Sequence, residues 1–108
     1  ERWKKGLAGL DRARVALAGF ARLRTLTEDE RTCSEFSGPP EQAPRGCRPW
    51  YELRRQEGAE TVLFGHWAAL GFRRLPGAVC LDNGCAWGRT LTALRLDDGE
   101  LFQEAMAE

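Results

Sequence analysis

The feature that most limits the possible folds is a proline-rich segment in the middle of the chain, residues 27–60. It has three glycines and no sustained hydrophobic period, and its prolines are Pro39, Pro40, Pro44 and Pro49. Proline fixes φ and lacks an N–H donor, so these positions exclude regular helix and central strand locally. Because structureless loops of this length are uncommon in compact domains, we expect the segment to be functional or packed on a core. Trp50 and Tyr51 are the expected anchors of its end.

The segments on either side carry different hydrophobic periods. Residues 8–26 place apolar side chains at three- and four-residue steps, which predicts an amphipathic helix. The residues of this apolar face are Leu10, Ala13, Leu17, Phe20 and Ala21. Short runs at 61–64, 78–82 and 90–96 predict strands, and Asp-Asp-Gly at 97–99 predicts a hairpin turn into a returning strand. The predicted fold class is α+β, a mixed α/β arrangement with a helical segment 1–26 and a strand-rich segment 61–104.

Charge and hydropathy restrict the classes of partner. The 108 residues contain 16 Lys and Arg and 16 Asp and Glu, so the net charge gives no argument for a specific nucleic acid. Residues 1–24 are locally basic, which fits a solvated helix face better than an anion-binding surface. No apolar run reaches the roughly 18 residues of a membrane span, and residue 1 onward lacks a signal-peptide pattern. We expect one small domain or part of a larger one, with no membrane partner and a cytoplasmic location.

The four cysteines lie at positions 33, 47, 80 and 85. None forms the C-x-x-C pair that is typical of zinc ribbons. Cys80 lies in an apolar run and is expected to pack as a small hydrophobic side chain. We expect reduced cysteines that bind no metal, with a disulfide and a metal site as the alternatives.

Two glycine-containing connectors follow predicted strands and carry the candidate functional residues. The first holds His66, which is the single histidine of the chain, and the second holds Asp82, Asn83 and Gly84. Histidine is a common metal ligand and acid–base group, but an isolated histidine is more often structural. Asp-Asn-Gly taken alone is typical of a tight turn in which the aspartate accepts local N–H groups. Trp67 and Trp87 follow the two connectors and either stack on a base or cover the core.

The motifs taken together resemble one family. FGHWAALG (64–71), LDNGCAWG (81–88) and TLTALRLDDGELF (90–102) are similar to the C-terminal part of the symmetrical diadenosine tetraphosphatases, which are bacterial calcineurin-like metallophosphoesterases. RWKKGLAGLDRAR (2–14), PPEQAP (39–44) and PWYE (49–52) resemble middle segments of that family in the same order. The resemblance extends over nearly the whole chain.

The resemblance implies a fold and a reaction. The implied fold is a β-sandwich flanked by helices, of which residues 1–108 are the C-terminal part. The implied reaction is cleavage of diadenosine tetraphosphate into two ADP by two divalent metals (manganese, cobalt or magnesium), which activate a water. His66 takes the place of a metal-ligand histidine, and Asp82, Asn83 and Gly84 take places that border the substrate. Arg12 and Arg14 are further candidates for phosphate contact, and capped RNA stays open as a substrate.

The chain also departs from the family pattern. Asn83 stands where threonine is usual, and Arg89 stands where glycine is usual. The other ligand motifs of the superfamily, D-x-H, G-D-x-x-D-R-G and G-N-H-[DE], do not occur in the sequence. We therefore expect a missing N-terminal metal-binding half and an inactive isolated chain. The alternatives are a non-catalytic module that binds a nucleotide or a protein, and a small metal module built from Cys80, Cys85 and His66.

Overall fold

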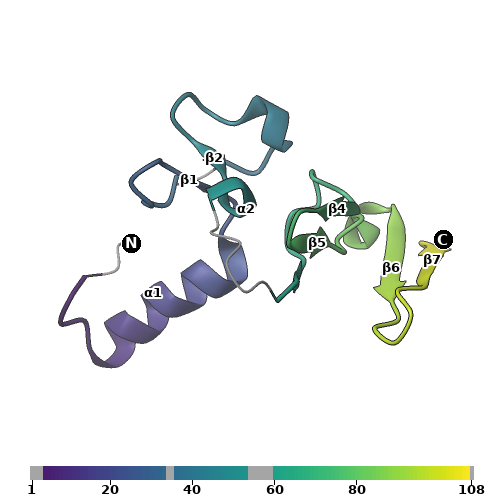
Figure 1. Cartoon of the computed structure of the whole chain (residues 1–108), viewed down its shortest axis with the longest axis horizontal. Coiled ribbons are helices and arrows are strands. Elements are labelled where there is room, and N and C mark those ends of the chain that lie inside the picture. Colours follow the sequence, from purple (N-terminus) through teal and green to yellow (C-terminus); the bar gives the residue numbers. More distant parts are fainter. Residues whose placement is uncertain (1–3, 34–35, 54–59, 108) are drawn as a thin grey trace.

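A computed structural model describes residues 4–33, 36–53 and 60–107. Helices and strands are mixed along the chain, so the predicted α+β class is confirmed (Figure 1). The radius of gyration is 15.4 Å, whereas a compact domain of this length has about 13 Å. The arrangement is therefore more open than that of a typical domain.

The first helix, α1, runs from Gly9 to Arg22 and confirms the predicted amphipathic helix. Asp11 in its first turn and Arg22 in its last turn both complement the helix dipole. The predicted end at residue 26 is wrong, because Thr25–Leu26 leaves the helix and forms strand β1. The apolar face of α1 is uncovered: Leu10, Leu17 and Phe20 are 75%, 67% and 94% exposed. The helix thus presents to solvent the side chains that its sequence pattern assigns to a core.

The proline-rich segment folds into short elements that are held by pairing. Strand β1 pairs antiparallel with β2 (Arg48–Pro49), with Thr25 opposite Pro49. Between them lies a 3₁₀ helix, η1 (Pro40–Gln42), and β2 leads directly into the short helix α2 (Trp50–Leu53). Proline is accepted here because a two-stranded ribbon has only edge positions.

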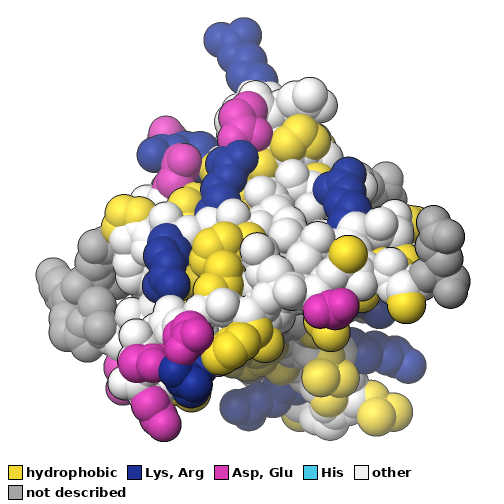
Figure 2. Space-filling model, turned by 90° about the vertical axis from the view of Figure 1, so that its right-hand side faces the viewer, with side chains coloured by type: hydrophobic (Ala, Val, Ile, Leu, Met, Phe, Trp, Pro, Cys, Tyr) yellow, Lys and Arg dark blue, Asp and Glu magenta, His cyan; other side chains and the backbone are white. Residues whose placement is uncertain are grey.

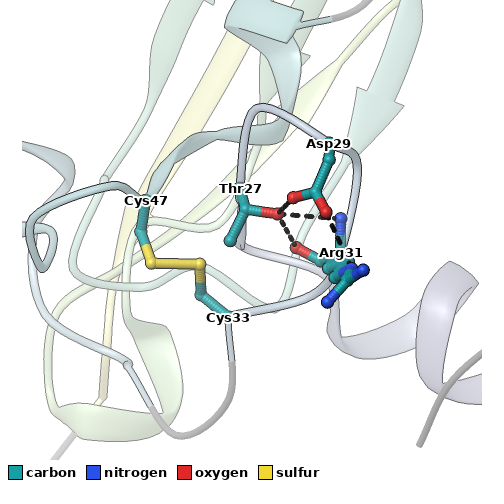
Figure 3. The surroundings of a disulfide bond; sticks show 5 residues. All are labelled: Thr27, Asp29, Arg31, Cys33 and Cys47. Carbon is teal, nitrogen blue, oxygen red and sulfur yellow. Dashed lines mark hydrogen bonds and ion pairs between the residues drawn. A yellow bond between two sulfur atoms is a disulfide. The ribbon is translucent and has the colours of Figure 1, made fainter.

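A disulfide joins Cys33 to Cys47, so the expectation of four reduced cysteines is wrong. Leu26 bridges Thr32 on one side and pairs with Arg48 on the other, which brings the two neighbouring cysteines to a Cα–Cα distance of 6.3 Å. That distance lies in the range that a disulfide spans. A spacing of 14 residues in the sequence does not reveal this pairing. Figure 3 shows the bond beside a turn in which Thr27 and Arg31 both contact the Asp29 carboxylate.

The strand-rich part forms two further sheets. Strand β5 (Ala78–Cys80) is central in a three-stranded sheet, with β3 (Val62–Phe64) parallel to it and β4 (Arg73–Leu75) antiparallel. After a 3₁₀ turn, η2 (Cys85–Trp87), strands β6 (Thr90–Leu94) and β7 (Leu101–Ala105) form an antiparallel hairpin. The predicted strands are confirmed apart from their ends, and β4 is an addition that the sequence did not indicate.

The core is small and lies against the three-stranded sheet. It consists of Tyr51, Trp67, Leu70, Ala78 and Cys80, with Trp50 and Phe64 packed on it. The rings of Trp50 and Phe64 meet edge to face with centroids 5.1 Å apart. Trp50 and Tyr51 are therefore confirmed as the anchors of the proline-rich segment.

The β6–β7 hairpin projects from this core at one end of the molecule (Figure 1). Viewed from that end, apolar side chains reach the surface among charged ones (Figure 2). Leu91 and Phe102 on the hairpin are 60% and 48% exposed. Within the described part of the chain, no helix is both long and apolar enough to cross a membrane.

Candidate functional site

The candidate site lies where the parallel strands β3 and β5 end. Phe64 is opposite Cys80, and its carbonyl accepts the N–H of Leu81 at 2.9 Å. One residue further on, a Cβ added to Gly65 would lie 4.0 Å from the Cβ of Asp82. This is an ordinary van der Waals distance, so the two strand ends lie side by side without crowding. His66 and Asp82 follow at the same sheet edge, where ligands of parallel sheets usually bind.

His66 has a left-handed backbone with φ of +73° and an exposed side chain. This conformation is uncommon for residues other than glycine, and it recurs at functional sites. Partial burial lowers the pKa of the imidazole, and the charges of Arg24 and Arg22 lower that pKa further, whereas Asp82 raises it. The neutral form, which has a free ring nitrogen for a metal or a proton, is thus favoured.

Asp82, Asn83 and Gly84 form the tight turn that their sequence predicts. The Asp82 Oδ1 accepts the N–H of Gly84 at 3.0 Å, and Gly84 has a left-handed φ of +72°. A Cβ at Gly84 would lie 2.8 Å from the Cδ of Arg89, which packs over the turn. A side chain at position 84 would therefore require Arg89 to shift, and it would also be strained by the left-handed φ. An open depression beside the turn is lined by residues of β3, the turn, η2 and β6.

The two tryptophans after the connectors have different environments. Trp67 is 1% exposed, and its Nε1 donates to the carbonyl of Gly38 at 2.8 Å. Trp87 is 80% exposed. Covering the core is thus the role of Trp67, whereas Trp87 keeps a free ring face.

Two arginines that sequence reasoning did not select lie near His66. Arg22 ends α1 and Arg24 precedes β1, and both act electrostatically on the imidazole. The carbonyl of Arg24 accepts the N–H of Trp50, whose ring packs on Phe64 two residues before His66. The helix pattern does not predict that these arginines lie near His66, because the pairing of β1 with β2 determines where the end of α1 lies.

Arg12 and Arg14, the arginines that the sequence did select, lie in the first half of α1. Figure 1 shows this half pointing away from the three-stranded sheet. Arg14 forms an exposed ion pair with Asp11 at 3.6 Å. The structure thus brings His66 together with Asp82 and Asn83, and it does not bring Arg12 or Arg14 into that group.

The donors present do not fit a complete metal centre. Among residues 4–33, 36–53 and 60–107, no three His, Cys, Asp or Glu side chains are grouped so as to hold a metal ion. Cys80 is buried and its thiol pKa is raised chiefly by burial, so it packs as predicted and is a poor ligand. The alternative metal module of Cys80, Cys85 and His66 has no support. His66 with Asp82 provides fewer ligands than zinc or magnesium needs.

Comparison with known proteins identifies relatives of this chain. It is 42% identical over 102 residues to a symmetrical bis(5'-nucleosyl)-tetraphosphatase of Aromatoleum aromaticum, and this match covers 94% of the chain. A protein of the same name from Methylobacillus flagellatus is 42% identical over 103 residues, and one from Glaesserella parasuis is 38% identical over 106. The chain belongs to the symmetrical bis(5'-nucleosyl)-tetraphosphatase family. No family model matches the chain.

The match to these tetraphosphatases is partial on their side. The chain spans 37% of the length of the Aromatoleum aromaticum relative and 39% of the Glaesserella parasuis relative. Most of each relative thus has no counterpart in these 108 residues. The resemblance that the motifs indicated is confirmed for the part of the tetraphosphatases that the chain spans.

Proposed function

We propose that this chain is the C-terminal part of a hydrolase that cleaves diadenosine tetraphosphate into two ADP. The observation that carries the proposal is the placement of His66 and Asp82 just beyond the carboxyl ends of two neighbouring parallel strands. The names of the relatives support the substrate class, because they are symmetrical tetraphosphatases. The shared length supports a part of the enzyme rather than the whole.

In this proposal His66 is one ligand of a metal centre whose other ligands come from additional chain. The bound divalent metals (manganese, cobalt or magnesium) would supply a water of lowered pKa at this site. The lowered pKa of His66 supports the role, because a metal ligand must be the neutral imidazole. The turn of Asp82, Asn83 and Gly84 borders the substrate. Residues 1–108 then belong to a single metallophosphoesterase domain of the β-sandwich type.

The uncovered face of α1 supports the need for additional chain. Leu10, Leu17 and Phe20 are each more than half exposed, and burying such a side chain contributes about 1.5–3 kcal/mol. The relatives are longer than this chain by more than its own length. We propose that the additional part covers this face when it completes the domain.

A chimera tests the proposal directly. In this chimera, residues 1–108 replace the matching stretch of the Aromatoleum aromaticum relative. With Mn²⁺, the chimera is expected to release ADP from diadenosine tetraphosphate, and His66→Ala is expected to abolish that release. The isolated 108-residue chain is expected to release none. Metal-dependent ADP release by the isolated chain, if His66→Ala abolishes it, would contradict the proposal that the other metal ligands come from additional chain.

The alternative is a non-catalytic module that binds a nucleotide or a partner protein. A chimera that folds but releases no ADP would favour it.

A further inference from the structure

Several arginines of the chain are paired with carboxylates. Arg31 pairs with Asp29 at 2.7 Å, and Arg73 pairs with Glu41 at 2.8 Å. Arg14, Arg48 and Arg95 are also paired. Within the described ranges, Arg22 and Arg24 have no carboxylate within ion-pair distance. These two positive charges are thus not neutralised by the part of the protein that the structure describes.

Arg24 is also held in place with one polar atom unsatisfied. Its main chain is fixed by the hydrogen bond from Trp50 N–H to its carbonyl at 3.0 Å. Its Nε is buried and, in the described part of the molecule, has no hydrogen-bond partner. A buried donor without a partner is costly, and a charged one more so. The Arg24 side chain as a whole is only partly buried, so an anion bound at its guanidinium group would satisfy this donor after a small movement of the side chain.

The position of the pair relative to His66 follows from the fold. Arg24 is joined through Trp50 to Phe64, which ends β3, and His66 is two residues further on. Arg22 lies at the end of α1, which is the end nearest to this sheet in Figure 1. Both guanidinium groups lie within electrostatic range of the His66 side chain.

We propose that Arg22 and Arg24 bind the phosphate groups of a polyphosphate-bearing ligand beside His66. Guanidinium groups present N–H donors in a planar fork that matches phosphate oxygens, and charge-assisted bonds of this kind are the strong ones. This assignment places phosphate contact at the end of α1, in place of Arg12 and Arg14. It rests on the proposed function in taking the ligand to be the polyphosphate of a nucleotide.

The test is binding of tripolyphosphate to the purified 108-residue chain in EDTA, by calorimetry. The NMR signals of His66 give a local reading, because the chain has one histidine. Tripolyphosphate is expected to bind and to displace these signals. Arg24→Gln is expected to weaken binding about tenfold or more, as for loss of a charged hydrogen bond. Arg22→Gln is expected to weaken it less, since this side chain is exposed.

Arg31→Gln is the control of equal charge, because Arg31 is already paired with Asp29. It is expected to leave both the affinity and the displacement unchanged. If Arg24→Gln does not fold, Arg22→Gln and Arg24→Lys replace it in the binding measurement. Arg22 is exposed, and Arg24→Lys keeps the positive charge, so both variants are expected to fold. The proposal is overturned if Arg31→Gln weakens tripolyphosphate binding as much as Arg24→Gln does. It is also overturned if only Arg14→Gln weakens binding, or if the wild-type chain does not bind tripolyphosphate.

Two further arms identify the ligand. ADP that binds more tightly than pyrophosphate supports a nucleotide, and equal affinities overturn the nucleotide assignment while leaving phosphate binding intact. These experiments contain no metal, so they succeed or fail independently of the hydrolase activity of the chimera.

Discussion

The indole Nε1 of Trp67 donates a hydrogen bond to the carbonyl of Gly38 at 2.8 Å, across 29 residues of sequence. This bond ties the proline-rich segment to the residue that follows His66. Nearby, Arg73 on β4 forms an ion pair with Glu41 of η1, so two contacts hold the same loop on the sheet.

Trp67→Phe is expected to destabilise the chain by about 1–3 kcal/mol, because it leaves the half-buried Gly38 carbonyl without its donor. Urea unfolding followed by circular dichroism measures the change. Trp87→Phe is the matched control, since Trp87 is 80% exposed, and should lie within about 0.5 kcal/mol of wild type. Equal stability of the two variants would show that the bond contributes nothing.

Removal of the disulfide tests whether Cys33 and Cys47 are paired and how much the bond stabilises the chain. The double change Cys33→Ser and Cys47→Ser is expected to cost about 3 kcal/mol, the value for a loop of this length. Cys85→Ser, at a free half-buried cysteine, is the control. Without reductant, the unfolded wild-type chain should show two titratable thiols out of four cysteines. Four thiols would contradict the pairing.

Stability should fall on mild acidification through His66. Its pKa is lowered in the folded chain, chiefly by burial and then by Arg24 and Arg22. The unfolded chain therefore binds a proton more readily, and stability is lost as the pH falls through about 6.5, the unfolded value. The melting temperature measured between pH 8 and pH 5.5 should decrease, and His66→Gln should reduce that slope. Identical slopes would show that His66 does not contribute.

The apolar face of α1 should contribute to stability only in a completed domain. In the isolated chain, Phe20→Ser should leave the melting temperature unchanged, because Phe20 is 94% exposed. In the chimera the same change should destabilise by about 2 kcal/mol or more, since a buried aromatic side chain is lost. Glu28→Ser, at an exposed polar position, is the control in both proteins. A chimera that tolerates Phe20→Ser would show that this face stays uncovered.

Much of the fold followed from local patterns. The helical period located α1, and the apolar runs located β3, β5, β6 and β7. Strand β4 (Arg73–Leu75) was not predicted, because two of its three residues are exposed arginines and it lacks an apolar run. The disulfide and the end of α1 depend on pairing between β1 and β2, which are two residues each and too short for a periodic signal.

The candidate site was predictable in its strand-end residues and not in its arginines. His66 and Asp82 each follow an apolar run, and parallel pairing of those runs brings them to one edge. Arg12 and Arg14 were selected from a resembling segment, whereas the position of Arg22 and Arg24 depends on how the chain turns after the helix. The roles of all these residues in substrate and metal binding stay predictions.

The most direct measurement of the central claim is ADP release from diadenosine tetraphosphate by the chimera with the Aromatoleum aromaticum relative, with and without His66. We predict Mn²⁺-dependent release by the chimera, none by the folded His66→Ala chimera, and none by the isolated chain. Undiminished release by a folded His66→Ala chimera would contradict the role of His66 as a metal ligand.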